Sequence, residues 1–178
     1  MTTPDKKPTY HNQLPIVRIW TDGSASPENP GPGGWAALLT HGTYEKMIGG
    51  STPWSSNIRM ELTAVLRGIQ SLKKESIVII YTDSQYMVDG FRNILHRDKI
   101  LKSHHDLWGL LLHLAQIHQV KIKKVKAHSG VPNNGRVDQH AKLMAKTQPG
   151  DSRMWPTERV LEKKKLDEKN VQKNSWEY

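Results

Sequence analysis

The sequence predicts an α/β fold with a five-stranded mixed sheet and helices on both faces. Three strand-like runs precede the first helical pattern, helical and strand patterns then alternate, and the run after the first helix is continuous and β-branched. The expected order of elements is β-β-β-α-β-α-α-β-α. A chain of 178 residues suits one domain with short extensions.

The first three strands should form an antiparallel meander. Residues 16–22 have the pattern of a strand, and the prolines and glycines of residues 27–33 indicate a turn before a second strand at 34–40. A third run, at 43–48, should end at the glycine pair 49–50.

Helices and buried strands follow. Apolar residues recur at helical spacing from Leu62 onwards, which predicts a helix over 59–74. Residues 77–81 have the composition of a central strand that is covered on both faces. A short helix at 84–90 and a charged linker should come next. The apolar stripe of a further helix, at 107–117, should pack in the core.

One domain, at residues 15–150, should hold all of these elements. The remaining ones are a fifth strand at 120–125, a polar loop at 127–135 and a helix at 136–147. We expect a flexible extension at 1–14 and a charged tail at 151–178 that is disordered or weakly helical. Trp155 and Trp176 in this tail could dock on the domain or on a partner.

Composition limits the possible functions. The formal net charge is +9, and most of it lies between residues 15 and 150, which suits a polyanion such as nucleic acid. The chain has no cysteine, and this excludes disulfides and thiolate zinc sites. It shows no secretory signal and no apolar run of membrane length, so we expect a cytoplasmic protein that does not bind membranes.

Four acidic residues, Asp22, Glu61, Asp83 and Asp138, stand where this fold gathers ligands. Taken singly, Glu61 and Asp138 suit the dipole of a helix's first turn, and the two aspartates that follow strands suit turns. Asp83 must lie at the carboxyl end of its strand, and Asp22 shares that edge if its own strand is a parallel neighbour. Four converging carboxylates would repel one another without a cation, so the pattern implies bound metal.

The predicted metal is Mg²⁺, with Mn²⁺ as a substitute, because all the donors are oxygen atoms. Two such cations about 3.5–4 Å apart can activate a water molecule and stabilise the leaving oxygen of a phosphodiester. The sequence leaves open whether one or two metal ions act and which of the two metals is preferred.

Five blocks, in this order, resemble type 1 ribonuclease H (RNase HI). They are residues 21–24 (Thr-Asp-Gly-Ser), 29–34 (Asn-Pro-Gly-Pro-Gly-Gly), 57–61 (Asn-Ile-Arg-Met-Glu), 82–85 (Thr-Asp-Ser-Gln) and 125–128 (Val-Lys-Ala-His) with Asp138. The match covers about residues 16–147. It implies a ribonuclease H-like fold and an endonuclease that hydrolyses the RNA strand of RNA–DNA hybrids, leaving 3′-hydroxyl and 5′-phosphate ends. It also implies that Asp22, Glu61, Asp83 and Asp138 are metal-binding catalytic carboxylates.

The resemblance assigns roles to five further residues. His128, on the polar loop, would assist proton transfer or product release. Asn29 and Gln85 would face the RNA strand, while Ser56 and Asn57 would lie beside a phosphate of the DNA strand. For each of these four residues, turn or cap chemistry is the structural alternative.

The sequence also departs from the family pattern. Ile58 stands where the family often has a second asparagine, Ala127 replaces a glycine, and the turn after Asp22 is one residue longer. Residues 86–108 are fewer than in relatives with a full basic protrusion, so hybrid affinity could differ. Four lysines within 121–126 form a second basic run, which is either a phosphate-contacting surface or a solvated strand face.

Two other functions fit parts of the pattern. One is a module that holds hybrid or structured RNA without cutting it, but none of the four acids has been lost. The other is a DNA-acting relative of transposases and integrases, against which the block around Glu61 and the His128 loop argue. We expect a monomer that binds RNA–DNA hybrids, and no protein partner is implied.

Overall fold

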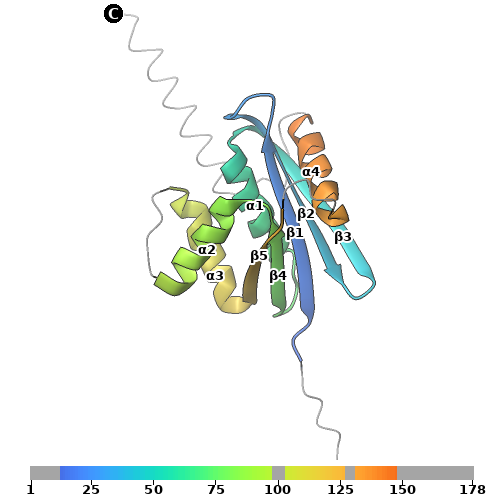
Figure 1. Cartoon of the computed structure of the whole chain (residues 1–178), viewed down its shortest axis with the longest axis vertical. Helices are drawn as coiled ribbons and strands as arrows, with labels where there is room; N and C mark the ends of the chain where they lie inside the picture. The colour runs from blue at the N-terminus through green and yellow to red at the C-terminus, as the bar shows by residue number, and fades with distance from the viewer. Residues whose placement is uncertain (1–12, 98–102, 127–130, 148–178) are drawn as a thin grey trace, which may run out of the picture.

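A computed structural model of the chain describes residues 13–97, 103–126 and 131–147, which form one sheet and the helices around it (Figure 1). The strands are β1 (Ile16–Ala25), β2 (Gly31–His41), β3 (Tyr44–Ser55), β4 (Ile77–Thr82) and β5 (Gln119–Lys124). The helices are α1 (Asn57–Gln70), α2 (Gln85–Arg97), α3 (His105–Ile117) and α4 (Pro132–Ala145). The predicted order of elements is confirmed.

The sheet is mixed, with the strand order β3-β2-β1-β4-β5. β1, β2 and β3 form the predicted antiparallel meander, β4 pairs in parallel with β1, and β5 pairs in parallel with β4. Parallel neighbours require crossover connections, which α1 provides between β3 and β4, and α2 with α3 between β4 and β5. The predicted five-stranded mixed sheet is therefore confirmed.

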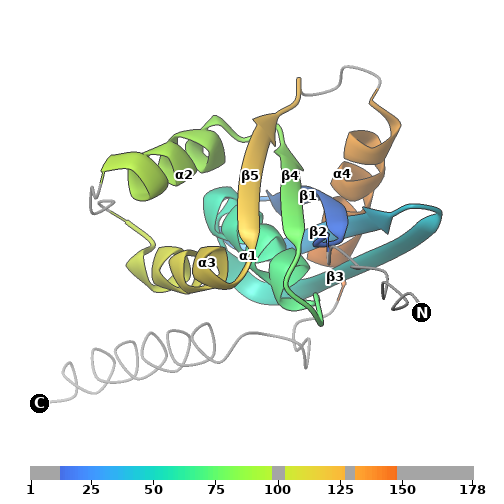
Figure 2. The same ribbon diagram turned by 90° about the horizontal axis from the view of Figure 1, so that it is seen from below.

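Helices cover both faces of the sheet, as predicted (Figure 2). On one face, α1, α2 and α3 enclose the larger apolar cluster, in which Ile19 and Ile80 are fully buried. The apolar stripe of α3 packs there through Leu107 and Leu111. On the other face, α4 packs on β1, β2 and β3.

The strands of the meander are longer than predicted because Gly31, Gly33, Gly49 and Gly50 lie within strands. β2 begins at Gly31, and β3 runs through Gly49 and Gly50 to Ser55. A side chain at Gly49 would come within 2.7 Å of the His140 ring of α4. These glycines therefore permit close packing within strands, whereas the sequence pattern indicated turns.

Several predicted helix boundaries were wrong. α1 spans Asn57–Gln70 rather than 59–74, because Ser56 caps its start: the backbone N–H of Arg59 donates to Ser56 Oγ at 3.3 Å. α2 continues to Arg97, through the segment predicted as a charged linker. α4 begins at Pro132 rather than at residue 136, since proline is well suited to the first turn of a helix.

The prediction that β4 is covered on both faces was also wrong. Val78 and Ile80 are buried beneath the helices of one face. Ile77, Ile79 and Tyr81 point to the other face and are only partly buried, because α4 does not extend over β4. The run of β-branched residues reflects strand propensity as well as burial.

The contact between α4 and β2 depends on Gly34. A Cβ at this position would lie 2.2 Å from the Ala141 carbonyl oxygen and 2.2 Å from the Ala145 nitrogen. We predict that Gly34→Ala lowers the free energy of unfolding by about 1–3 kcal/mol or more, because backbone atoms cannot move aside cheaply. Chemical denaturation would measure the change.

Gly109→Ala is the matched control for this prediction. Gly109 lies within α3, and a Cβ there would meet nothing within 4 Å. The control should gain about 0.5–1 kcal/mol from improved helix propensity. Equal stabilities for the two variants would contradict the proposed contact.

Candidate active site

Two of the four predicted acids lie on neighbouring parallel strands. Trp20 of β1 pairs with Tyr81 of β4, and Asp22 and Asp83 each lie two residues further along. Asp83 therefore follows the carboxyl end of β4, and Asp22 lies beside it within β1, which continues to Ala25 rather than ending at residue 22 as predicted. This is the edge at which open α/β sheets bind ligands. The expectation that Asp22 shares the edge of Asp83 is confirmed.

Glu61 reaches this edge because α1 lies directly against β1. A Cβ at Gly23 would come within 2.1 Å of the Glu61 nitrogen, so the helix backbone touches the strand where a side chain is missing. Glu61 lies in the second turn of α1, whose first turn contains no acidic residue. The helix-dipole explanation for Glu61 was therefore wrong.

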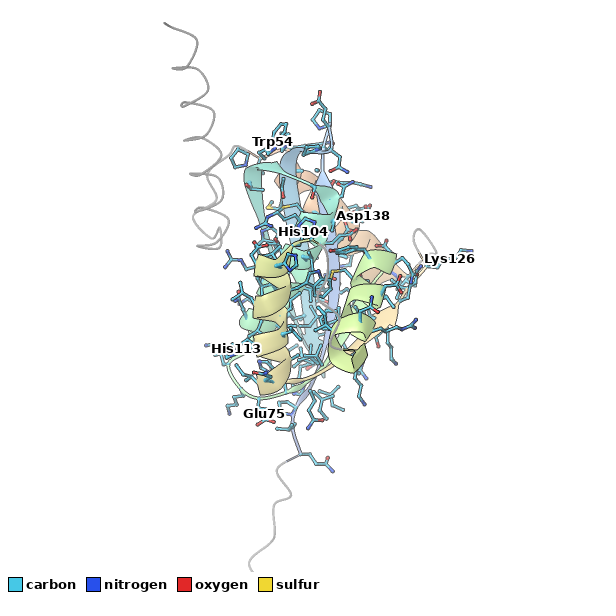
Figure 3. The ribbon with its side chains drawn as sticks, turned by 90° about the vertical axis from the view of Figure 1, so that its left-hand side faces the viewer. Trp54, Glu75, His104, His113, Lys126 and Asp138 are labelled. Carbon is cyan, nitrogen blue, oxygen red and sulfur yellow. The ribbon has the colours of Figure 1, made fainter. Side chains whose placement is uncertain are left out.

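Asp138 comes from α4, on the other side of β1. The close packing at Gly34 brings α4 onto the sheet, and Asp138 lies in its second turn rather than its first. The dipole explanation therefore fails here as well. Lys142, one turn further on, forms an ion pair with Asp138 at 2.7 Å. In Figure 3, Asp138 and His104 lie toward the end of the domain opposite Glu75, the residue shortly before β4.

The four carboxylates act on one another electrostatically. Burial, with the charges of Asp83, Asp138 and Glu61, raises the pKa of Asp22 to about 8. Burial, with the charge of Asp83, also raises the pKa of Glu61, although a hydrogen bond to Ser84 opposes this shift. The Oε2 atom of Glu61 is buried and has no hydrogen-bond partner. Such a site is short of positive charge.

An open cavity of about 390 Å³ lies at these acids. Asp22, Glu61 and Asp138 line it together with Asn57 and Lys142. Buried carboxylate oxygens, one of them without a partner, are the donor set that a hard divalent cation prefers, so these residues fit such an ion.

Two of the acids are turned toward other partners. Asp138 faces Lys142, and Asp83 accepts a hydrogen bond from Asn134 Nδ2 at 3.2 Å. In this arrangement, no three acidic or histidine side chains within the described residues are grouped to hold one ion. Binding a cation would therefore require side-chain rotation, for which Asp138 is suited because its partner Lys142 is half exposed.

The predicted substrate-binding residues divide into two groups. Asn29, Ser56 and Asn57 are close together: Asn57 N–H donates to Asn29 Oδ1 at 3.1 Å, and Asn57 Oδ1 accepts from Ala25 N–H at 2.5 Å. These contacts are the turn and cap chemistry of the structural alternative. Asn57 also lines the cavity, so its backbone contacts and a ligand contact are compatible.

Gln85 is separate from this group. It begins α2, where its amide donates to Asp89 at 2.8 Å and accepts from the Lys124 ammonium of β5. His128 and Ala127 lie outside the described residues, as do the extension before residue 13 and the tail after residue 147.

Three residues near the acids were missed by sequence reasoning. The four-residue spacing of Asp138 and Lys142 is a recognisable helical ion-pair signal. Asn134 had been assigned to a loop, so its contact with Asp83 could not be expected. Ser84 follows Asp83 directly, and no local pattern indicated its hydrogen bond to Glu61.

A family model described as RNase H matches residues 15–146. The chain belongs to the RNase H family. It is 42% identical over 139 residues to ribonuclease H of Gluconobacter oxydans, covering 72% of this chain and 91% of that protein. It is 40% identical over 140 residues to ribonuclease H of Bradyrhizobium sp. strain ORS 278, covering 74% of this chain and 90% of that protein. The predicted family is confirmed.

Solved structures of RNase H proteins share the fold. LC9-RNase H1, a type 1 RNase H with the type 2 active-site motif, aligns with a TM-score of 0.68 and 24% identity, covering 79% of this chain and 76% of that chain. LC11-RNase H1 in complex with an RNA/DNA hybrid aligns with a TM-score of 0.57 and 18% identity, covering 71% of this chain and 94% of that chain. The predicted ribonuclease H-like fold is confirmed.

None of the described helices has the length and apolar character that a membrane span requires.

The raised pKa of Asp22 predicts how stability depends on pH without divalent cations. Between the ordinary value of 3.8 and the folded value of about 8, the folded protein holds a proton that the unfolded chain releases. Stability should therefore fall as pH rises across this window. Asp22→Asn should remove this loss of stability. At pH 8 its free energy of unfolding should exceed that of wild type by about 1 kcal/mol or more, since one pKa unit corresponds to about 1.36 kcal/mol.

Thermal unfolding in a chelator at pH 4 and pH 8 would measure this effect. Glu28→Gln, at an exposed position, serves as the control and should follow wild type at both pH values. A wild-type protein that gains stability relative to Asp22→Asn on going from pH 4 to pH 8 would contradict the prediction.

Proposed function

We infer that this chain is a ribonuclease H whose catalytic carboxylates are Asp22, Glu61, Asp83 and Asp138. Hydrolysis of the RNA strand of RNA–DNA hybrids is the activity of the family to which the chain belongs. The observation that carries the assignment of residues is the mutual electrostatic effect of these acids at the cavity. The raised pKa of Asp22 is typical of functional sites.

RNase H proteins generally use a divalent metal ion. We propose Mg²⁺, with Mn²⁺ as a substitute, held by the four carboxylates, because hard oxygen donors select these ions. A bound cation would activate a water molecule and stabilise the leaving oxygen. Attack at phosphorus breaks its bond to the 3′ oxygen and leaves 3′-hydroxyl and 5′-phosphate ends.

The chain's own residues prepare this site. Asp22 and Glu61 are held in place by β1 and the second turn of α1, and both are largely buried while they line the cavity. Lys142 pairs with Asp138, and Asn134 donates a hydrogen bond to Asp83, so both of these acids have a polar partner within α4. We assign His128 a role in proton transfer or product release, on family resemblance alone.

We propose that the substrate is an RNA–DNA hybrid, the ligand named for LC11-RNase H1. Asn29, Ser56 and Asn57 would contact it beside the cavity, and Gln85 would contact the RNA strand from α2. The exposed side chain of Ile58, next to Asn57, would offer the groove of the hybrid an apolar contact where the family often has an asparagine. The monomeric state and the cytoplasmic location stay predictions.

Purified protein with Mg²⁺ should cleave the RNA strand of a labelled hybrid and spare duplex DNA. Asp22→Asn and Asp83→Asn should each lower the rate about a hundredfold or more, since loss of a cation ligand removes several kcal/mol of transition-state stabilisation. Glu75→Gln, at the opposite end of the domain, should retain the wild-type rate (Figure 3). Gel assays of the cleavage products measure all four proteins.

Failure of the wild-type protein to cut with either metal would favour a module that binds hybrids without cleaving them. Cleavage of duplex DNA instead would favour the transposase-like alternative. Unchanged rates in both aspartate variants would mean that the acids have been assigned wrongly.

Deletion of residues 151–178 should leave hybrid cleavage within about twofold of the full chain, because the described residues contain all four carboxylates and three clusters of buried apolar side chains. The same cleavage assay, with circular dichroism to check folding, measures this. A truncated protein that is folded but inactive would show that residues 151–178 are needed for cleavage.

A further inference from the structure

One part of the sheet surface beside the carboxylates is not covered by any of the four described helices. α4 packs on β1, β2 and β3, while α1, α2 and α3 lie on the opposite face, so side chains of β1, β4 and β5 that point to the side of α4 extend beyond it. We call this surface the open face. It consists of Ile16, Arg18, Trp20, Ile77, Ile79, Tyr81, Gln119, Lys121 and Lys123. Trp20 forms its border with α4, because this side chain is partly buried against the apolar cluster that α4 shares with β2.

The open face leads directly to the acidic edge. Trp20, Tyr81 and Lys123 form one row across the three parallel strands. Asp22 lies two residues beyond Trp20 in β1 and therefore on the same side of the sheet. Asp83 follows β4 and contacts Asn134 of α4, which packs on that side. A strand of nucleic acid that leaves the carboxylates in this direction would pass over the open face.

The open face is basic. Arg18, Lys121 and Lys123 are exposed, and none of its nine side chains is acidic. Within the described part of the chain, these three residues form no ion pair. The lysines of β5 do not all lie on this face, because Lys124 points to the opposite face of the sheet, where it contacts Gln85 of α2. A surface of this charge complements a polyanion.

Aromatic rings interrupt the basic surface. Trp20 and Tyr81 stack with their centroids 4.8 Å apart and their planes at 11°. The Lys123 ammonium, from the strand on the other side of Tyr81, lies 6.0 Å from the centroid of the Tyr81 ring. An exposed cation holds a ring face less strongly than a stacked base does. A base could therefore displace Lys123 from the ring and leave its ammonium free to contact a phosphate.

We propose that the open face binds single-stranded RNA that extends from the hybrid past the carboxylate edge. The three strands span roughly 10 Å, which is narrow for a duplex and suits one strand. Alternating cations and aromatic rings are typical of single-strand binding surfaces. The proposal rests on the proposed function, in which the RNA strand is the one that passes the acids.

The test compares the affinity of the full chain for a blunt hybrid and for the same hybrid with a ten-nucleotide RNA extension, at either the 5′ or the 3′ end. Fluorescence anisotropy in a chelator measures both affinities without cleavage. One of the two extensions should tighten binding by wild type about tenfold. Lys121→Gln with Lys123→Gln should abolish this gain and reduce the salt dependence of log K for the extended hybrid by about 1.4.

Two controls make the test specific. Lys73→Gln with Lys74→Gln removes the same charge from exposed residues between α1 and β4, and should keep the gain. Tyr81→Phe should keep the gain and Tyr81→Leu should lose most of it, with thermal unfolding used to verify both folds. Equal affinities of wild type for blunt and extended hybrids would overturn the proposal, as would equal losses in the two double lysine variants.

The proposed function can fail separately from this inference. Cleavage of the blunt hybrid with Mg²⁺ tests the nuclease assignment and does not involve the extension. A protein that shows the gain in affinity but does not cleave would keep the open face as a single-strand surface and reject the nuclease. Cleavage without a gain in affinity for the extended hybrid would keep the nuclease assignment and reject the open face as a single-strand surface.

Discussion

Close backbone contact between helices and strands is the constraint on which the site depends. α1 touches β1 at Gly23, and α4 touches β2 at Gly34, in each case with no room for a Cβ. A side chain at either glycine would push a helix, together with its acid, away from the sheet edge. Because catalytic and metal-binding groups must be held within about 0.5 Å of a productive geometry, two missing methyl groups determine whether the four carboxylates act as one site.

The geometry has an electrostatic cost that the folded chain only partly offsets. Burial and three neighbouring carboxylates raise the pKa of Asp22 to about 8, whereas Lys142 is half exposed and contributes a small opposing effect. An exposed ion pair of this kind is typically worth less than 1 kcal/mol. The acids therefore form a site whose full charge develops only when a cation binds, and this couples ion binding to stability.

The sequence predicted the sheet, the order of elements and the meeting of Asp22 with Asp83, because strand ends and parallel crossovers obey topological rules. The features that sequence patterns predicted wrongly are those that depend on tertiary contacts. The glycine pair 49–50 indicated the end of a strand, although Gly49 lies within β3 and gives the His140 ring of α4 close access to it. The first-turn explanation of Glu61 failed because Ser56 caps α1 further upstream than the apolar pattern indicated. No local signal could have indicated the contact of Asn134 with Asp83.

The period of two along a strand connects the acidic edge with the basic surface beside it. On β1, the side that carries Asp22 also carries Trp20 and Arg18, because alternate residues share a face. Parallel pairing with β4 and β5 extends this arrangement sideways, so rings and cations form rows across the three strands, and Asp22 and Asp83 lie beyond the row of Trp20, Tyr81 and Lys123. α4 can cover only the meander, since it must bring Asp138 to β1 and pack on Gly34. The helix position that completes the acidic site is therefore also the reason that the open face stays uncovered.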